Sequence, residues 1–346
     1  MSAEGTYLAI DGGTTRTRVR LWHADRVIDE CEAHAGARDV AADGEARPIE
    51  EALRVLIRTL RERNAVEPSA VVCSGMISSD VGLVNVPHVH APVTLTDLAL
   101  SLFRHDIVNV TELPLYFVPG VKTVADSVRW ETVTKLDVMR GEEAEVTGLL
   151  SAVELTPTLA FFHCGSHHKL ILVSDIHENR PHLTGFRGYE ATLVRSSTAL
   201  TGELLAAIQQ RTILASSVND LDTVELDWDA VAEGARSARA AGFARAAFLV
   251  RVCETVAGFG RDSATSFLIG ALADLDLQLI EHTDALDNDL VVYGGGVFPA
   301  VLSSLLEKAG ARTVRRISPA MSEHVAALGA VRLLETFLAE RGRTTG

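Results

Sequence analysis

The sequence predicts an α/β fold made of two related lobes. Near the N-terminus a short apolar run, Tyr7–Ile10, enters a glycine-rich turn and is followed by an alternating strand, a pattern typical of a buried hairpin. The same order of strand, glycine–hydroxyl turn and strand returns 152 residues later, at Leu159–Val173. Most of the remaining C-terminal half carries apolar residues at helical spacing. A chain of 346 residues is long enough for two such units.

The first half of the chain opens with a strand meander and continues with alternating helices and strands. Thr17, Val19 and Leu21 alternate with polar or larger residues, as expected of a strand that returns from the turn. Apolar residues among the charges of residues 48–63 indicate an amphipathic helix. We expect strands at 7–10, 17–22, 26–33 and 71–73, and helices at 48–63 and 141–153.

The second half repeats the opening and is then largely helical. Moving the first hairpin by 152 residues places Gly13-Thr14 on Gly165-Ser166, and a third strand would follow at Arg180–Thr184. The duplication puts the lobes at 1–154 and 155–346, with the last helix packing back on the first lobe. We expect helices at 199–211, 227–256, 262–283, 298–309 and 322–340, interrupted by one strand at Leu290–Tyr293.

The composition excludes several classes of protein. Lys and Arg total 32 against 46 Asp and Glu, and this net charge of −14 argues against binding to a nucleic-acid backbone. Four well-separated cysteines without a CxxC pair indicate reduced thiols in the cytoplasm. No apolar run reaches the ~20 residues of a membrane span, so no membrane partner is expected. The oligomeric state stays open, a homodimer included.

The first turn, Asp11-Gly12-Gly13-Thr14-Thr15, has the residues of an anion-binding hairpin. Glycine allows backbone amides to approach a phosphate closely, and the two threonine hydroxyls add donors. Asp11 at the strand end could hold Mg²⁺ beside those phosphates. A plain β-turn with a surface aspartate is the alternative.

Two further glycine turns point to the same chemistry. Gly165 and Ser166 repeat the first turn, so two hairpins could hold a polyphosphate. The Gly294–Gly296 cluster precedes a helix, and its bare backbone could lie against a purine. A strand-to-helix turn that merely needs glycine is equally compatible. Neither a Gly-x-Gly-x-x-Gly turn after the first strand nor a Walker-type loop occurs.

Phosphoryl transfer to an alcohol needs a carboxylate that accepts the hydroxyl proton. Glu142 is our first candidate and Asp137 the second, although acids in a first helical turn are often only partners of the helix dipole. Lys169 and Arg18 beside the hairpins could neutralise phosphate charge, or be solvated strand residues. The three histidines His163, His167 and His168 point to different faces of a strand and turn, which disfavours a zinc site.

These motifs together resemble the 2-dehydro-3-deoxygalactonokinase family of the acetate and sugar kinase, heat-shock cognate and actin superfamily. The similarity runs over nearly the whole chain, and its most specific part is Asp137-Val138-Met139-Arg140-Gly141-Glu142-Glu143. The other matching segments are Ile10–Thr15 with Arg18, Ser74-Gly75-Met76, Val118-Pro119-Gly120, Gly165–Lys169 (similar to Gly-Thr-His-Ser-Lys), Leu200–Leu204, Ser266–Gly270 and Gly294-Gly295.

The resemblance implies two actin-like (ribonuclease H-like) lobes, each a mixed β-sheet with flanking helices, and ATP with Mg²⁺ in a cleft between them. It implies transfer of the γ-phosphate to 2-dehydro-3-deoxy-D-galactonate, giving the 6-phosphate. We assign catalysis to Asp11, Glu142, Asp137 and Lys169, with Asp11 on the metal. We assign ATP binding to Gly13, Thr14, Thr15, Gly165, Ser166, His167, Gly294, Gly295 and Gly296, and sugar-acid binding to Arg18, Gly75, Met76 and Arg140.

The chain departs from the family at several positions. Gly12 stands in place of a tryptophan, and Ser78–Asn85 keeps only Gly82 of an Arg-Gln-Gly-Trp-x-Glu pattern. Asp80 occupies the arginine position, where a sugar carboxylate would want a cation. Three alternatives therefore remain: a kinase for a different sugar, a nucleotide or sugar sensor with little catalysis, and a hydrolase of a phosphate polymer.

Overall fold

The computed structural model describes residues 5–178, 189–221 and 223–344, so the strand expected at Arg180–Thr184 lies outside the described residues. The chain forms two compact units. The first unit comprises Met1–Pro157, Val173–Arg195 and Glu323–Gly346, and the second comprises Thr158–Leu172 and Ser196–Ser322. Each is described below by itself, and the boundary near residue 155 stays a prediction.

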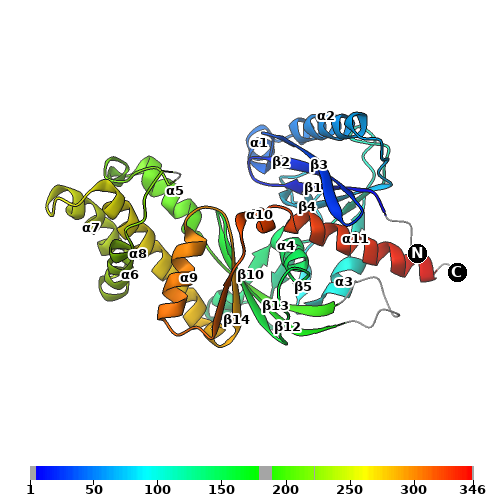
Figure 1. The fold of residues 1–346 in the computed structure, drawn as a ribbon. Helices are drawn as coiled ribbons and strands as arrows, with labels where there is room; N and C mark the ends of the chain where they lie inside the picture. Colours follow the sequence, from blue (N-terminus) through cyan, green and yellow to red (C-terminus); the bar gives the residue numbers. More distant parts are fainter. Residues whose placement is uncertain (1–4, 179–188, 222, 345–346) are drawn as a thin grey trace. The chain divides into compact units, whose positions relative to one another are not determined.

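The first unit is built on a mixed sheet with the strand order β3-β2-β1-β4-β8-β7 (Figure 1). β1 pairs antiparallel with β2 and parallel with β4, so the ends of β1 and β4 lie at the same edge. The strands are β1 (Tyr7–Gly12), β2 (Thr17–His23), β3 (Arg26–Ala33), β4 (Ala70–Gly75), β7 (Phe103–Arg104) and β8 (Leu115–Phe117).

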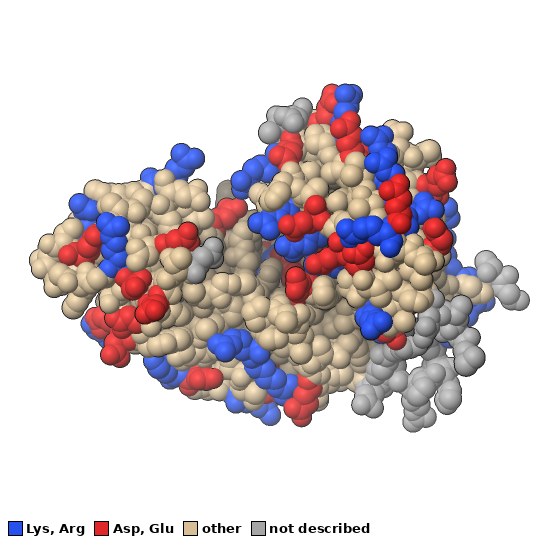
Figure 2. Space-filling model, turned by 45° about the horizontal axis from the view of Figure 1, so that its top comes forward, with Lys and Arg blue, Asp and Glu red and all other residues tan. Residues whose placement is uncertain are grey.

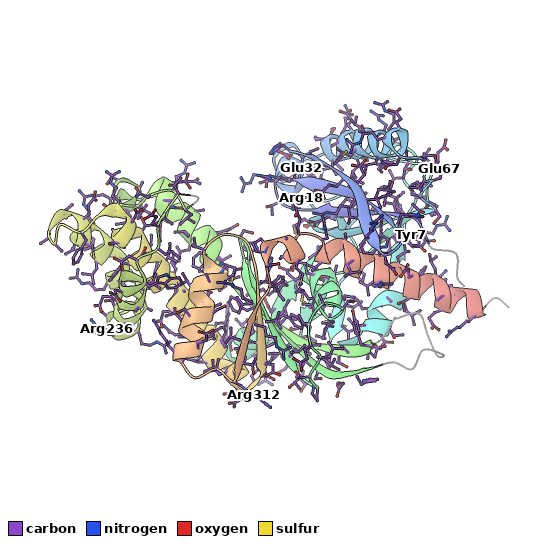
Figure 3. The ribbon with its side chains drawn as sticks, in the orientation of Figure 1. Tyr7, Arg18, Glu32, Glu67, Arg236 and Arg312 are labelled. Carbon is purple, nitrogen blue, oxygen red and sulfur yellow. The ribbon has the colours of Figure 1, made fainter. Side chains whose placement is uncertain are left out.

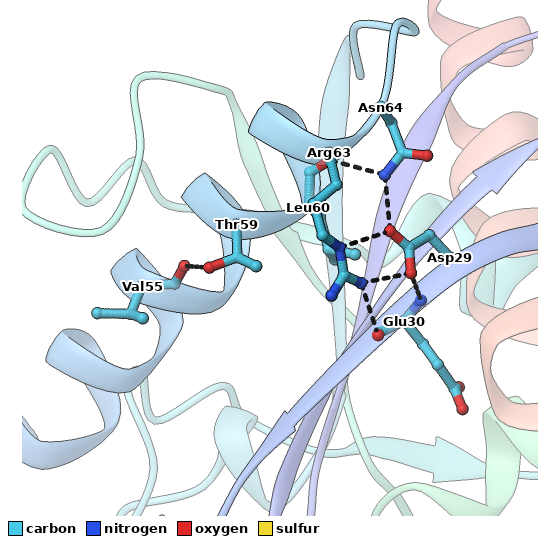
Figure 4. A network of polar contacts seen from close by, with 7 residues as sticks. All are labelled: Asp29, Glu30, Val55, Thr59, Leu60, Arg63 and Asn64. Carbon is cyan, nitrogen blue, oxygen red and sulfur yellow. Dashed lines mark hydrogen bonds and ion pairs between the residues drawn. The ribbon is translucent and has the colours of Figure 1, made fainter.

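Helix α2 (Arg47–Arg63) covers one face of this sheet because its apolar residues follow one stripe. Ile49, Leu53 and Leu60 are each at most 2% exposed. The helix ends at a polar network: the Arg63 guanidinium donates to the carboxylate of Asp29 on β3, and the Asn64 amide donates to the same carboxylate and to the Leu60 carbonyl (Figure 4). These bonds fix the C-terminus of α2 against β3.

The rest of the first unit comprises a small sheet, a strand pair and short helices. The small sheet has the order β10-β9-β5, and β13 pairs antiparallel with β6. The elements are α1 (Ala37–Asp43), β5 (Val89–Ala91), β6 (Val93–Thr94), α3 (Leu95–Leu100), β9 (Val121–Thr123), β10 (Asp137–Met139), α4 (Glu142–Leu149), β13 (Tyr189–Ala199, of which the part up to Arg195 belongs to this unit) and α11 (Val325–Thr344).

Helices α4 and α11 pack with their backbones in close contact. A Cβ on Gly329 would lie 1.8 Å from the Ala144 carbonyl oxygen, and one on Gly148 would lie 2.0 Å from that of Val325. No side chain fits at either place, so the two glycines set how closely these helices approach. α11 also contacts β1, β2 and β4 of the large sheet. The last helix therefore holds α4 to the sheet that carries the first hairpin.

The second unit combines a mixed sheet with a cluster of helices (Figure 1). Its strands follow the order β15-β14-β11-β12, and β11 is parallel to β14. The strands are β11 (Leu159–Cys164), β12 (His168–Glu178, of which the part up to Leu172 belongs to this unit), β14 (Asp289–Gly294) and β15 (Thr313–Arg316). The helices are α5 (Thr201–Arg211), α6 (Trp228–Ala241), α7 (Phe243–Thr255), α8 (Arg261–His282), α9 (Phe298–Lys308) and α10 (Pro319–Ser322).

Helix α8 is the central helix of this unit. By length and composition alone it could cross a membrane, but 78% of its most apolar window is buried inside the protein. Its neighbours α6, α7 and α9 pack around it. We therefore interpret α8 as a core helix.

The predicted fold class, a mixed α/β fold, is confirmed, but three details of the prediction were wrong. The helix expected over 227–256 is two helices, because Gly242 takes a φ of +82° and ends α6. The helix expected over 322–340 becomes α10 and α11. Strand 290–293 is not alone in the C-terminal half, since β13 and β15 are also strands.

Basic and acidic side chains are interspersed on the face drawn in Figure 2, including the region of β1–β3 and α2. No single basic face appears in that view, in agreement with the acidic balance of the sequence.

Candidate active site

The first hairpin forms a pocket at the end of β1. The turn closes through a hydrogen bond from the Gly13 amide to the Arg16 carbonyl oxygen, at 2.8 Å. Thr14 and Thr15 at its tip are exposed, and Asp11 is half-buried. The pocket has a volume of about 340 Å³ and is lined by Asp11, Gly13, Thr14, Thr15, Arg16 and Arg18.

The backbone of this hairpin is held from behind by the start of α1. The amides of Ala37 and Arg38 donate to the carbonyl oxygens of Gly13 and Thr14, at 3.2 and 2.8 Å. A Cβ on Gly36 would lie 2.6 Å from the Thr14 carbonyl, so glycine is needed for this approach. The turn carbonyls are thereby satisfied within the first unit, while the hydroxyls of Thr14 and Thr15 stay at the surface.

Three segments of the first unit converge beside Asp11. The parallel pairing of β1 with β4 places Asp11 next to Ser74 and Gly12 next to Gly75. A Cβ on Gly75 would lie 3.3 Å from Asp11 Oδ1, and a Cβ on Gly141 would lie 3.2 Å from the Gly75 Cα. Gly75 and Gly141 have φ angles of +82° and +115°, which favour glycine. The first turn of α4 therefore lies close to the Asp11 carboxylate.

Two adjacent glutamates begin α4 and take different environments. Glu142 is half-buried, and its Oε2 accepts a hydrogen bond from the Arg140 amide at 3.0 Å. Glu143 is 0% exposed, and both of its carboxylate oxygens accept from the Gly141 amide, at 2.8 and 2.9 Å. Burial, together with repulsion from Glu142, raises the pKa of Glu143 to about 7. Glu142 is thus the more accessible of the two carboxylates.

Arg140 holds the segment in which the chain departs from the family. Its guanidinium donates to the backbone carbonyls of Ser78 and Val86 and to the Ser78 hydroxyl. Gly82 packs against the carbonyls of Met76 and Ile77, so the segment is a compact turn. Burial lowers the pKa of the Arg140 guanidinium, against the opposing effect of Glu143 and Asp80.

The remaining predicted residues of the first unit take varied positions. Met76 is half-buried and directly follows Gly75 at the end of β4. Arg18 is the cross-strand neighbour of Asp11, and its guanidinium pairs with Glu32 on β3 at 3.1 Å (Figure 3). Asp137 is the first residue of β10 and is separated from Gly141 by the rest of that strand, which spans roughly 7 Å to Met139 at ~3.3 Å per residue. Asp137 is thus the less well placed of the two candidate bases.

The environment of Glu143 predicts a specific pH dependence of stability. Its pKa of about 7 lies above the 4.5 of an ordinary glutamate, so between these values the folded chain binds more protons than the unfolded chain. The free energy of unfolding should therefore fall, by about 3 kcal/mol, as the pH rises through this window. In Glu143→Gln, which cannot titrate at this position, that loss should be absent.

Urea unfolding at pH 5 and pH 8 measures this effect. From pH 5 to pH 8 the free energy of unfolding of Glu143→Gln should rise relative to that of the wild type. Glu51→Gln, at an exposed site on α2, should show the same pH dependence as the wild type. Equal pH dependence in Glu143→Gln and the wild type would show that Glu143 does not titrate as described.

The second hairpin joins β11 to β12 and is held in a similar way. The Glu203 amide at the start of α5 donates to the Ser166 carbonyl at 2.9 Å, and a Cβ on Gly202 would lie 2.1 Å from the Gly165 carbonyl. The His167 ring pairs with the Glu203 carboxylate at 3.2 Å. Ser166 at the tip is exposed. The start of α5 supports this turn, as the start of α1 supports the first one.

The late glycine cluster lies beside the second hairpin. The parallel pairing of β11 with β14 places Gly294 next to Cys164, the last residue before Gly165. A Cβ on Gly294 would lie 2.2 Å from the Cys164 carbonyl oxygen, and its φ is +122°. Gly295 and Gly296 are exposed, and α9 begins two residues later. The second unit therefore brings together Gly165, Ser166 and Gly294–Gly296.

The three histidines near the second hairpin have separate partners. His163 stacks on Tyr293 with ring centroids 4.9 Å apart, His167 pairs with Glu203, and His168 contacts Asp276. Over residues 5–178, 189–221 and 223–344, none of the three belongs to a group of side chains spaced to hold a metal. Lys169 is 4% exposed, so its ammonium is largely withdrawn from solvent.

The fold is shared with two solved structures of low sequence identity. A protein from Sinorhizobium meliloti, assigned as a 2-dehydro-3-deoxygalactonokinase, superposes with a TM-score of 0.72 at 19% identity, over 94% of this chain and 97% of the other. An activator of 2-hydroxyisocaproyl-CoA dehydratase from Clostridium difficile superposes with a TM-score of 0.51 at 11% identity, over 99% and 98%.

The family model of 2-keto-3-deoxy-galactonokinase matches residues 11–328, and the chain belongs to this family. The 2-dehydro-3-deoxygalactonokinase of Escherichia coli (strain K12) is 24% identical over 290 residues, covering 84% of this chain and 85% of the relative. The protein is therefore a kinase, a phosphotransferase with an alcohol acceptor, of the sugar-acid type. The resemblance found in the sequence is confirmed.

Sequence reasoning missed several residues that shape the site. Gly36 and Gly202 allow α1 and α5 to reach the two hairpins, and Glu143 binds the amide of Gly141. The signal for Glu143 was present, since two adjacent glutamates in one helical turn cannot both point the same way. Gly202 lies in the matching segment Leu200–Leu204, but nothing local shows that either glycine contacts a hairpin, because their partners lie about 20 and 40 residues away in sequence.

Proposed function

We propose that the protein transfers the γ-phosphate of ATP to the terminal hydroxyl of a sugar acid, with 2-dehydro-3-deoxy-D-galactonate as the leading substrate and its 6-phosphate as the product. The observation that carries this proposal is the convergence of Asp11, Gly75 and the first turn of α4 in the first unit. Gly75 lies against Asp11 and Gly141 lies against Gly75, which supports a site that combines a carboxylate of the hairpin with a carboxylate from the start of α4.

The hairpins fit a nucleotide by their chemistry. The exposed hydroxyls of Thr14, Thr15 and Ser166 are oxygen donors of the kind that bind phosphate, and Gly13 and Gly165 permit close approach. The backbone of Gly294–Gly296 offers a surface without side chains for adenine. The Clostridium difficile activator of the same fold was solved with bound ADPNP, which supports a nucleotide here.

Mg²⁺ fits the carboxylate of Asp11, since hard cations prefer oxygen ligands, and the pocket beside Asp11 is lined by Thr14 and Thr15 together with Arg16 and Arg18, whose charges suit the phosphates. When bound, the ion would neutralise phosphate charge. Asp11 would position it, and Lys169 would offset the charge that develops on the transferred group.

Glu142 is the proposed acceptor of the sugar hydroxyl proton. As the new O–P bond forms and the bond to the leaving ADP breaks, the proton passes to the Glu142 carboxylate. Glu143 holds the Gly141 amide and thereby fixes the start of α4. Asp137 remains the second candidate.

The proposed sugar-acid contacts are Arg18, Gly75, Met76 and Arg140. The Arg140 guanidinium donates to the carbonyls of Ser78 and Val86. Arg140 would therefore contribute to sugar-acid binding by fixing the conformation of the 78–86 segment. Asp80 at the exposed side of the same segment favours a sugar acid whose carboxylate lies away from it. The altered segment is the observation that keeps a different sugar acid as the second candidate.

A coupled ADP-release assay over keto-deoxy sugar acids and plain hexoses, with and without Mg²⁺, tests the proposal. We expect a Mg²⁺-dependent rate, well above the basal ATPase rate, with 2-dehydro-3-deoxy-D-galactonate. A higher kcat/KM for another sugar acid would correct the substrate. ATP binding without phosphorylation of any acceptor would instead support the sensor alternative.

We further propose that the kinase acts in the cytoplasm on small molecules, without nucleic-acid or membrane partners. All four cysteines, Cys31, Cys73, Cys164 and Cys253, carry free thiols, which suits a reducing compartment. A homodimer remains an open prediction that light scattering can test.

A further inference from the structure

A histidine is buried directly behind the second hairpin. His168 is the first residue of β12, and its ring is 1% exposed. Its Nδ1 lies 2.7 Å from Oδ2 of Asp276 on α8. The ring meets Phe298 edge to face, with centroids 4.7 Å apart, and Phe162 at 6.0 Å. One polar contact and two aromatic rings therefore define the position of this side chain.

The Asp276 carboxylate has a separate partner for each oxygen. Oδ2 contacts His168, and Oδ1 accepts a hydrogen bond from the Thr201 hydroxyl at 2.6 Å. Asp276 is 0% exposed and Thr201 is 2% exposed, so water does not compete for these bonds. A carboxylate oxygen accepts hydrogen bonds, so this contact corresponds to the tautomer of His168 that carries a proton on Nδ1. Burying a carboxylate without hydrogen-bond partners lowers the free energy of unfolding, and the two partners of Asp276 offset this loss.

His168, Thr201 and Phe298 are the first residues of three elements that begin next to the proposed nucleotide contacts. His168 follows the turn Gly165–His167, and Thr201 precedes Gly202 and Glu203, which pack on the carbonyls of Gly165 and Ser166. Phe298, against the His168 ring, is the first residue of α9 after the glycine cluster. The cluster thus joins β12, α5 and the start of α9 to the core helix α8.

We propose that His168, Asp276 and Thr201 form a positioning network that sets the geometry of the second hairpin and the late glycine cluster, and thereby the affinity for nucleotide. None of the three is assigned a contact with substrate, so they act through the turns that they hold. The inference rests on the proposed nucleotide-binding role of these turns.

Thr201→Val is the sharpest test, because it removes a hydroxyl at nearly constant volume. Without this donor one oxygen of the buried Asp276 carboxylate loses its partner, and the start of α5 is released from α8. We expect the Kd for MgADP, measured by isothermal titration calorimetry, to rise about 10-fold, on the scale of a lost hydrogen bond to a charged group. Thr201→Ser keeps the hydroxyl and should bind within about 2-fold of the wild type.

A matched control separates positioning from general destabilisation. Thr265→Val makes the same change on α8, where the fully buried Thr265 hydroxyl bonds the Asn219 amide and the Arg261 carbonyl. It should lower the melting temperature but leave the Kd for MgADP unchanged. In turnover, Thr201→Val should raise the KM for ATP about 10-fold and change kcat less than about 3-fold. A merely structural role would not produce this split.

A second pair of variants keeps the test open should Thr201→Val not fold. His168→Asn retains a donor toward Asp276, whereas His168→Ala loses both the donor and the ring contact with Phe298, so His168→Ala should bind MgADP more weakly. Equal affinities of Thr201→Val and Thr201→Ser, or of His168→Ala and the wild type, would overturn the inference. A wild-type protein that binds no MgADP would instead refute the proposed function of the turns.

Discussion

Asp11→Asn is expected to lower kcat by at least about 10³-fold while the protein remains folded. The reason is electrostatic: a neutral amide cannot position a divalent cation beside phosphates, and such an ion contributes several kcal/mol to the stabilisation of the transferring group. The substitution keeps the size of the side chain, and Asn tolerates the strand-end position of Asp11 at the edge of the first pocket.

Steady-state ADP release at saturating ATP and sugar acid measures the effect, with circular dichroism and thermal melting as the check on folding. The Mg²⁺ dependence adds a second readout, because Asp11→Asn should need a higher Mg²⁺ concentration for whatever rate remains. Asp25→Asn is the matched control. Asp25 lies in the turn at the opposite end of β2, where its φ of 60° also suits asparagine, and its loss should leave kcat unchanged. Wild-type turnover in Asp11→Asn would show that Asp11 does not position the metal ion for catalysis.

The two hairpins could be predicted from sequence because their determinants are local. Glycine and hydroxyl residues stand directly after a short apolar run in both copies. Moved by 152 residues, β1 (Tyr7–Gly12) coincides with β11 (Leu159–Cys164), so the repeat inferred from the residues has the same strand bounds in the structure. The late glycine cluster follows the same logic, since β14 ends at Gly294.

The faces of the strands could not be predicted in the same way, as Arg20 shows. Alternation along β2 suggests that Arg20 lies on a solvated face, yet it is 1% exposed and its guanidinium pairs with Glu30 at 2.9 Å. Trp22 on the same face is 4% exposed. Helix α11, about 300 residues later in the chain, packs against β1, β2 and β4. Because the covering helix is so distant in sequence, the residue pattern of β2 does not show that this face is buried.

The candidate site shows the same division between local and distant causes. The motif at 137–143 contains both glutamates of α4, but which of these carboxylates faces outward depends on how α4 packs on α11 through Gly148 and Gly329. Likewise, Arg140 is a cation in a matching motif, and only the fold shows that its donors reach Ser78 and Val86. Tertiary contacts decide these roles, so residue type alone does not.

Glu142→Gln is expected to lower kcat by about 10²- to 10⁴-fold, the usual contribution of a positioned general base. The amide keeps the hydrogen bond that the Arg140 amide donates, since its carbonyl oxygen can still accept, but it cannot take a proton from the sugar hydroxyl. The KM for ATP should change little, because Glu142 is not assigned a contact with the nucleotide. The acid limb of the kcat–pH profile should also disappear with the base.

Asp137→Asn and Glu143→Gln, compared with Glu142→Gln, make the assignment decisive. Asp137 lies at the start of β10, four residues before Gly141 in the sequence, so Asp137→Asn should cost far less activity. Glu143 is fully buried and faces the Gly141 amide, so Glu143→Gln should act mainly through stability. A larger loss in Asp137→Asn than in Glu142→Gln would transfer the role of base to Asp137. If all three variants kept full turnover, the proton would have to pass to a group outside the 137–143 segment. The proximity of α4 to Asp11 would then play no part in catalysis.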